Sequence, residues 1–291
     1  VTTLGEVSGF IAGRVLVRGE DDWPLPGTAW ARLYLDAGRT GSAASLNDGA
    51  LAIRPSASSG SDMALLASTP SASASFRTAL SAAGHGHEGF GAPQAVAPLS
   101  NLRAAEATAL TYTSAPLAQN LELSGPIVLR VFASATATDF DWAVNLTDVW
   151  PDGRSEWISD GFLRASLRRV DQAQSRRNAA GEIIRPWYPF NTRESVPSGE
   201  VVEYLIELTP ISNVFQAGHR IRLDLFPAVS GLVDSALTGG VGTLTVMHGS
   251  ARPSSLLLPV VPGRCQTGMP LVDDLAPPDR CANNLAQALD R

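Results

Sequence analysis

Residues 126–169 carry the clearest strand pattern of this chain, and they constrain its fold more than any other feature. Apolar side chains recur at every second position in 127–133 and again in 140–146, which is the period of a half-buried β-strand. Pro151, Asp152 and Gly153 then give a turn signal, because proline presets φ, aspartate can bond its own backbone and glycine accepts positive φ. Residues 157–163 carry the chain back. The segment therefore predicts three strands joined by tight turns, which form the centre of a sheet.

The same period returns along the rest of the chain. Further strands are expected at residues 10–17, 30–36, 108–113, 121–123, 201–209, 219–226, 242–247 and 255–261. The 26 Gly and 20 Pro make turns frequent, which suits short strands better than long helices. Short helices are expected at 76–83 and 283–289. Roughly ten strands about 8 to 12 residues apart predict an all-β, jelly-roll-like β-sandwich.

Residues 41–100 have a different composition, rich in Ala, Ser, Gly and Pro and poor in large apolar side chains. This composition predicts a long irregular loop or poorly ordered linker inside a β-sandwich domain that spans residues 1–262. Residues 263–291 form a Pro-rich tail that contains both cysteines, Cys265 and Cys281. A disulfide across the fifteen intervening residues would contribute roughly 3 kcal/mol of stability. We therefore expect a disulfide and a secreted or cell-surface protein, with two free thiols in the cytoplasm as the alternative.

The charge and hydropathy of the chain exclude several classes of partner. The formal net charge is −6, and all 22 basic residues are arginines. A general nucleic-acid binder would carry a basic stripe, so no nucleic-acid partner is predicted. No apolar run approaches the ~18 to 20 residues needed to span a bilayer, so no membrane partner is predicted either. The sequence leaves the oligomeric state open, and a homo-oligomer is compatible with it.

Catalytic and metal-binding residues are hard to find in this sequence. A nucleophile elbow needs glycine on both sides of the serine in G-x-S-x-G, and no serine here has this setting. His85, His87 and Glu88 lie close together and could ligate a metal, but a Gly-rich loop holds ligand geometry poorly. We expect a solvent-exposed loop there, and no cofactor. His219 and His248 lie near strand ends and are interpreted as hydrogen-bonded structural histidines.

Four aromatic side chains are weak candidates for a binding site. A row of exposed aromatic rings could stack on a sugar, although tryptophans on strands more often belong to the core. The candidates are Trp150, Trp157, Trp187 and Tyr188.

Several phrases of the sequence together resemble the C-terminal domain of X-Pro dipeptidyl-peptidases and their relatives, the cocaine esterase (CocE/NonD) hydrolases among them. The matching segments are residues 22–24 (DWP), 110–117 (LTYTSAPL), 138–140 (TDF), 146–153 (LTDVWPDG), 160–165 (DGFLRA), 215–223 (FQAGHRIRL) and 253–259 (PSSLLLP). They follow one another in the family's order and span most of the chain. The resemblance implies a jelly-roll (galactose-binding-like) β-sandwich that is attached to an α/β-hydrolase domain.

The resemblance also implies a function. In that family the Ser, His and Asp of catalysis belong to the hydrolase domain, so no catalytic residue is expected in this chain. The first hypothesis is a non-catalytic domain that packs on an α/β-hydrolase catalytic domain of the same protein and shapes it. That parent would cleave esters or amides. The alternative is an independent carbohydrate- or ligand-binding jelly-roll module, which would present exposed tryptophans on one face.

Overall fold

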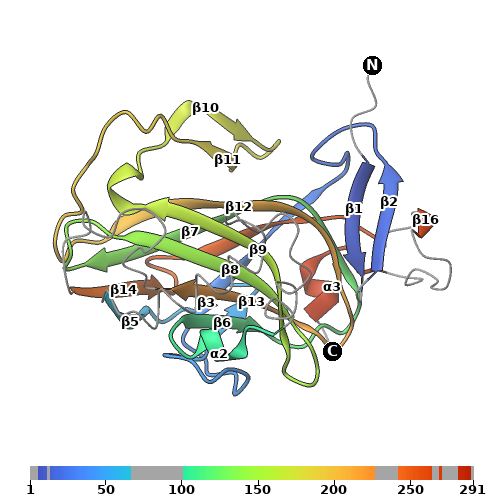
Figure 1. The fold of residues 1–291 in the computed structure, drawn as a ribbon, viewed down its shortest axis with the longest axis horizontal. Helices are drawn as coiled ribbons and strands as arrows, with labels where there is room; N and C mark the ends of the chain where they lie inside the picture. The colour runs from blue at the N-terminus through green and yellow to red at the C-terminus, as the bar shows by residue number, and fades with distance from the viewer. Residues whose placement is uncertain are drawn as a thin grey trace, which may run out of the picture.

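The computed structural model describes residues 6–11, 14–66, 101–226, 242–263, 269–270 and 281–289, which form mostly β-strands (Figure 1). In chain order the strands of the main sheet are β1 (Glu6–Ile11), β2 (Arg14–Gly19), β3 (Ala29–Asp36), β4 (Gly49–Ala52), β5 (Gly60–Leu66), β6 (Leu110–Ser114), β7 (Leu121–Ala135), β8 (Asp141–Val149), β9 (Ser155–Arg164), β12 (Val202–Phe215), β13 (Arg220–Phe226), β14 (Gly242–His248), β15 (Ser255–Val260) and β16 (Met269–Pro270). A separate antiparallel pair consists of β10 (Asp171–Arg177) and β11 (Ile183–Trp187). The described helices are α2 (Arg103–Glu106), α3 (Leu285–Leu289) and a 3-10 turn at Ala165–Leu167.

Hydrogen bonds close nine of these strands into a barrel-like ring. The strands follow one another as β12-β9-β8-β13-β6-β4-β3-β15-β7, and β12 pairs back with β7 along most of its length. Both strands are long, with 14 residues in β12 and 15 in β7, so each can pair with strands on two sides of the fold. The all-β prediction is confirmed. The described strands of the main sheet belong to one hydrogen-bonded sheet, and the jelly-roll sandwich stays a prediction.

The three central strands are confirmed as β7, β8 and β9, with the turn where the sequence predicts it. β8 pairs with β9 from Asp141 opposite Arg164 to Val149 opposite Ser155. In the turn, Gly153 has a φ of +83° and donates its N–H to the carbonyl of Trp150 at 2.9 Å. The residues predicted to form a short strand at 121–123 instead begin β7, which continues to residue 135.

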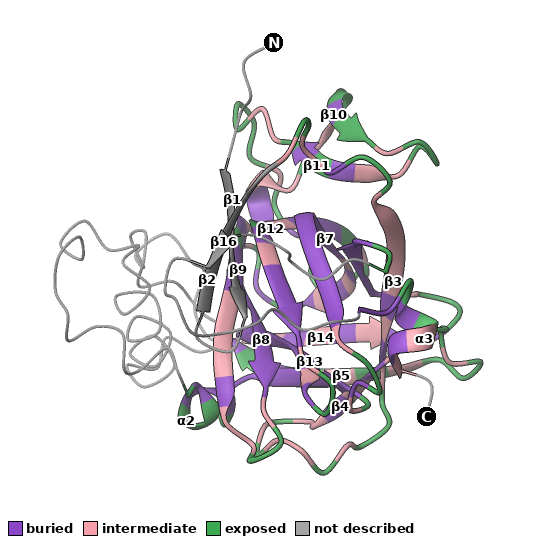
Figure 2. Ribbon diagram, turned by 90° about the vertical axis from the view of Figure 1, so that its right-hand side faces the viewer, coloured by how far each residue is buried: buried purple, intermediate pink, exposed green. Residues whose placement is uncertain are grey.

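The core lies inside the ring, where every second residue of each strand points. It contains the predicted apolar rows of β7 and β8, and the ring strands are largely buried in Figure 2. At its centre three fully or almost fully buried aromatic rings contact one another edge to face. Trp142 lies 5.3 Å from Phe140 and 5.3 Å from Tyr204, measured between ring centroids. Edge-to-face pairs of this kind add about 0.5 to 1.5 kcal/mol beyond the area they bury.

The structure differs from the sequence prediction in residues 41–66. This part of the predicted linker contains β4 and β5, and β4 is a member of the ring between β3 and β6. Short, small-residue strands such as GALA carry little apolar signal, so composition hid them. The helix expected at 76–83 and the rest of the predicted linker, 67–100, lie outside the described residues.

Two other segments are more ordered than the sequence suggests. Residues 171–198, where no strand is predicted, contain the β10–β11 pair, which lies over β7 and β12 in Figure 1. At the end of the predicted tail, α3 falls within the predicted helix at 283–289, and Leu285 and Ala288 belong to the core. Among the described residues, no helix is long and apolar enough to cross a membrane.

Candidate functional site

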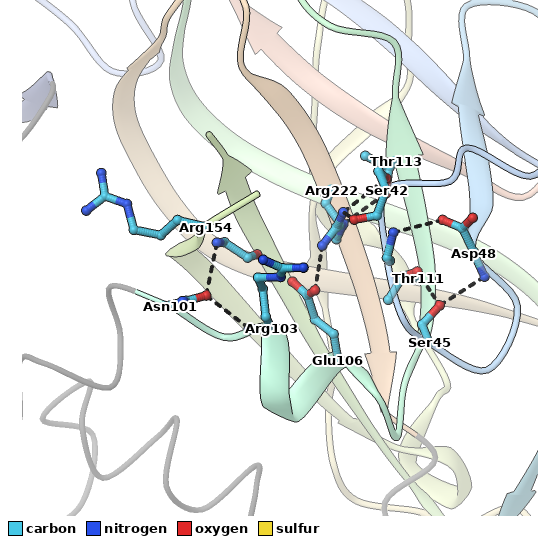
Figure 3. A network of polar contacts seen from close by, with 12 residues as sticks. Ser42, Ser45, Asp48, Asn101, Arg103, Glu106, Thr111, Thr113, Arg154 and Arg222 are labelled. Carbon is cyan, nitrogen blue, oxygen red and sulfur yellow. Dashed lines mark hydrogen bonds and ion pairs between the residues drawn. The ribbon is translucent and has the colours of Figure 1, made fainter. Parts of the chain in front are cut away.

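A fully buried arginine organises the polar side of the ring that faces α2. Arg222 lies on β13 and is 0 % exposed, and the residues that alternate with it, Ile221, Leu223 and Leu225, point the other way into the core. Its Nη1 donates to Oε2 of Glu106 at the end of α2, and its Nε donates to Oγ1 of Thr113 at 2.9 Å. Its Nη2 donates to the carbonyl oxygen of Ser42 at 2.9 Å. Figure 3 shows Arg222 held in this way by a helix, a strand and a loop that are far apart in sequence.

The loop that brings Ser42 to Arg222 is fixed by Asp48. The Asp48 carboxylate accepts from the Thr40 hydroxyl at 2.7 Å, from the Gly41 N–H at 2.7 Å and from the Ala43 N–H at 3.1 Å. Burial alone would raise the pKa of Asp48, but these hydrogen bonds outweigh it and lower the pKa below its usual value. The loop is therefore an ordered part of the site, although its composition predicts a linker.

Asp224, two residues after Arg222, is a fully buried carboxyl group on the same strand. It lies in register between Thr111 of β6 and Asn145 of β8, and its side chain is 0 % exposed. Neither of its carboxylate oxygens has a hydrogen-bond partner among the described residues. Burial, followed by the negative charge of Glu106, raises the pKa of Asp224 well above its usual value, while the charge of Arg222 acts in the opposite direction. Asp224 therefore keeps its proton to a higher pH than an exposed aspartate does.

We expect Asp224→Asn to stabilise the chain at neutral pH and to do so less in acid. A carboxyl whose pKa is raised by folding binds its proton more tightly in the folded state, so stability falls as pH rises from the unfolded pKa towards the folded one. Each unit by which folding raises the pKa lowers the free energy of unfolding by about 1.4 kcal/mol at high pH. Asparagine avoids this loss because its carboxamide does not ionise. Urea unfolding between pH 4 and pH 8 measures the difference. Glu200→Gln, at an exposed position, is the matched control, and equal pH profiles for the two variants would contradict the prediction.

Two buried histidines pair with aspartates and not with serines. His219 places Nδ1 2.9 Å from Oδ1 of Asp148, which confirms the prediction of a hydrogen-bonded structural histidine. Burial raises the pKa of Asp148, and the hydrogen bond from His219 acts against that rise. His248 places Nε2 3.5 Å from Oδ2 of Asp62. Within the described residues neither ring is hydrogen-bonded to a serine hydroxyl.

The four aromatic candidates come from different elements and differ in exposure. Trp150 lies at the turn after β8 and is only partly exposed, with the guanidinium of Arg154 3.6 Å from its ring centroid. Trp157 is half-buried on β9, a strand of the ring. Trp187 is 51 % exposed, but it lies on β11, and the neighbouring Tyr188 is half-buried with its hydroxyl bonded to a carbonyl of β12. The rings therefore belong to different elements, and the carbohydrate alternative stays a prediction.

The remaining candidates lie largely outside the described part of the chain. His85, His87, Glu88 and Cys265 are not among the described residues, so the metal and disulfide predictions stay predictions. Cys281 is described and is 6 % exposed. Within the residues that the structure describes, no group of three or more His, Cys, Asp or Glu side chains could hold a metal ion.

β5 carries an exposed apolar pair at the edge of the sheet. It is the last strand in the sheet order and pairs with β14, and its other edge has no partner strand in the described residues. Met63 and Leu65 are 64 % and 65 % exposed and, two residues apart, they point to the same side of the strand. On the opposite side, Asp62 accepts a hydrogen bond from the Tyr112 hydroxyl at 2.9 Å. Met63 and Leu65 are therefore exposed on a strand that is fixed by its pairing with β14 and by the hydrogen bond between Tyr112 and Asp62.

Comparison with known proteins identifies the family. The sequence profile of the X-Pro dipeptidyl-peptidase C-terminal non-catalytic domain matches residues 3–256. The chain belongs to this family. The family's name describes a domain that accompanies a catalytic one, and the motifs at 110–117, 160–165 and 215–223 lie on β6, β9 and β13, within the ring. The predicted family membership is confirmed.

Individual members of the family are longer than this chain. Cocaine esterase from Rhodococcus is 28 % identical over 265 residues, which cover 87 % of this chain and 41 % of the esterase. A provisionally named serine esterase from Mycobacterium tuberculosis is 35 % identical over 164 residues, 55 % of this chain and 25 % of that protein. Among solved structures, a CocE/NonD family hydrolase from Staphylococcus aureus superposes on this chain with a TM-score of 0.61 at 17 % sequence identity. The match covers 88 % of this chain and 41 % of the hydrolase chain, and it shows that the two share a fold. The chain therefore spans less than half the length of these relatives.

Proposed function

We propose that this chain is the accessory domain of a serine hydrolase of the dipeptidyl-peptidase and acyl-esterase class, and that it packs on the α/β-hydrolase catalytic domain and helps to wall its acyl pocket. The observation that carries the proposal is the family match over residues 3–256, with a chain that spans only 41 % of cocaine esterase. Members of this family are thus built from this domain and a larger remainder. A non-catalytic domain affects the reaction through contact with the catalytic one.

The apolar pair on β5 supports one particular docking edge. An exposed, apolar edge strand is a template for unwanted pairing, and proteins normally cover or charge such an edge. Met63 and Leu65 are among the most exposed large apolar side chains of the described residues, and both lie on this edge. Cover by the catalytic domain would bury them. We therefore place the contact with the catalytic domain at β5.

Hydrogen exchange tests this contact. In the parent hydrolase, the amides of Gly60–Leu66 that do not bond β14 should exchange more slowly than in the isolated chain, while the amides of Asp171–Arg177 should exchange equally in both. Met63→Lys combined with Leu65→Lys should abolish the difference. Phe190→Lys is the matched control, because Phe190 is 61 % exposed and lies in the loop after β11. Equal exchange of the β5 amides in both proteins would show that the catalytic domain does not contact β5. The family assignment would not be affected.

Labelling with a fluorophosphonate tests the non-catalytic role itself. The isolated chain should show no more labelling than a heat-denatured sample and no turnover of p-nitrophenyl acetate, because the nucleophile belongs to the catalytic domain. Specific labelling of one serine of this chain would overturn the accessory-domain proposal, and the position of that serine would identify the active site.

Three finer assignments are also proposals. The ring is proposed to correspond to the family's jelly-roll sandwich, which a strand-by-strand superposition on the hydrolase from S. aureus would check. The pairing of Cys265 with Cys281, and with it an exported protein, is proposed from the sequence. The mass of the unreduced chain after alkylation tests this pairing, because two free thiols would each take up one alkyl group.

A further inference from the structure

A polar cavity lies between the β10–β11 pair and the outside of the ring. Its volume is about 390 Å³, which is within the range of small-molecule sites. Its walls come from β3, β7, β10, β11, β12 and β15, so the two-stranded sheet that Figure 1 shows over β7 and β12 forms one side of it. The residues at its floor are apolar and buried: Val128, Leu205 and Leu257 are 3 %, 9 % and 1 % exposed.

Two of the three arginines that line the cavity are already paired with carboxylates. Nη2 of Arg32 lies 2.8 Å from Oε1 of Glu182, and Nε of Arg130 lies 3.0 Å from Oε1 of Glu203. The ring and the β10–β11 pair are held together by the first of these contacts. The two pairs cancel their charges, so they leave the third arginine to set the charge of the cavity.

That third arginine, Arg177, donates to neutral acceptors in the described part of the chain. Its Nη1 donates to the carbonyl oxygen of Gly181 at 2.6 Å, and its Nη2 donates to Oε1 of Gln172 at 2.6 Å. Among the described residues it makes no ion pair. The parallel N–H donors of an arginine fit the two oxygens of a carboxylate. In Arg177 one of these donors, Nη2, is bonded to the amide oxygen of Gln172, which is exposed.

Arg130, although it forms an ion pair with Glu203, contributes a second N–H group to the cavity lining. Although its Nε is close to Glu203, the N–H does not point at that carboxylate, and the buried Nε atom has no hydrogen-bond partner in the described part of the chain. An acceptor that enters the cavity would find this N–H without a hydrogen bond.

We propose that this cavity binds a small organic carboxylate, with the carboxylate on Arg177 in place of the Gln172 oxygen and near the free donor of Arg130, and with the apolar part of the ligand on the floor of Val128, Leu205 and Leu257. The positive charge of Arg177 selects an anion. The apolar floor selects an organic anion over an inorganic one. The inference concerns a different surface from the β5 edge and does not depend on the role of the chain as an accessory domain.

The test uses sodium benzoate as the ligand probe and the ¹⁵N-labelled 291-residue chain. Titration at constant ionic strength should shift the amide signals of β10, β11 and the adjoining residues of β7 and β12, with a dissociation constant on the order of 1 mM. Benzamide, a neutral molecule of nearly the same shape, should bind at least about tenfold more weakly, and so should sodium sulfate, which has no apolar part.

Substitutions then locate the binding. Arg177→Gln should weaken benzoate binding about tenfold, Arg177→Lys should weaken it less because the charge remains without the fork, and Arg193→Gln, at an exposed position outside the cavity, should leave it unchanged. The proposal is wrong if benzoate causes no shifts at these residues, if Arg177→Gln and Arg193→Gln bind it equally, or if benzamide binds as well as benzoate. Binding of sulfate as tight as that of benzoate would also overturn it, since the site would then be a simple anion site.

Discussion

Replacement of Arg222 by methionine should lower the free energy of unfolding by about 3 to 5 kcal/mol at neutral pH. The guanidinium is 0 % exposed, and it is the cation that faces two buried carboxyl groups, Glu106 and Asp224. Methionine fills a similar volume but leaves Glu106 without its counter-charge and leaves the Thr113 hydroxyl and the Ser42 carbonyl without their donor. The loss therefore comes from the partners left behind more than from the bond itself. Urea unfolding followed by far-ultraviolet circular dichroism measures it.

The pH dependence of this loss distinguishes the charge explanation from a simple packing defect. Without Arg222, the charge that opposes the raised pKa of Asp224 is gone, so the folded protein binds the Asp224 proton more tightly than the unfolded chain between the unfolded and folded pKa values. Stability then falls as pH rises through that window and returns as pH is lowered. Arg222→Met should accordingly lose less stability at pH 4 than at pH 8. A loss that is equal at both values would show a packing defect, and Arg193→Met, at an exposed position, should lose little at either.

The strands at the centre of the fold could be predicted because their chemistry is local. In 127–133 and 140–146 the apolar side chains alternate, and burial of one face of a strand fixes this period whatever the neighbouring strands are. The turn at Pro151, Asp152 and Gly153 is equally local, since it depends on the φ preferences of the residues within it. Such features are present in any single stretch of sequence.

The polar side of the ring could not be predicted because its partners come from distant segments. Residues 219–226 alternate clearly, and the apolar half of that pattern predicts a strand with a core face. The same alternation places Arg222 and Asp224 together on the other face. This part of the polar side is visible in the sequence, although the sequence analysis does not use it. What the sequence does not show is that Glu106 and Ser42 cover this face, 116 and 180 residues away from Arg222.

The closure of the ring depends on a glycine, and only the structure explains why a glycine is needed at that position. Gly161, within the DGFLRA motif, is the residue of β9 that pairs with Leu208 of β12. A Cβ atom at this position would lie 2.6 Å from the carbonyl oxygen of Glu207, closer than real contacts allow. The glycine therefore lets two backbones approach where the sheet closes. The sequence marks the position through its resemblance to the family, and the structure supplies the cause.

The aromatic core gives the second large effect that we expect. Trp142→Ala should lower the free energy of unfolding by about 3 to 5 kcal/mol. The indole is 0 % exposed and contacts two aromatic rings, Phe140 just before β8 and Tyr204 of β12, each at 5.3 Å between centroids. Its removal leaves a cavity between β8 and β12 that the surrounding strands can fill only in part, because their positions are fixed by the hydrogen bonds that close the ring.

Trp142→Phe should cost much less than Trp142→Ala, for two reasons. A phenyl ring keeps most of the edge-to-face contact with Phe140 and Tyr204. The indole Nε1 is buried without a hydrogen-bond partner in the described residues, so phenylalanine removes an unsatisfied donor together with part of the ring. Trp187→Ala is the matched control, because Trp187 is 51 % exposed, and it should change the unfolding free energy by no more than about 0.5 kcal/mol. If Trp142→Ala unfolds at the same urea concentration as Trp187→Ala, the aromatic group does not hold β8 and β12 together, and the stability of the ring must come from its backbone pairing.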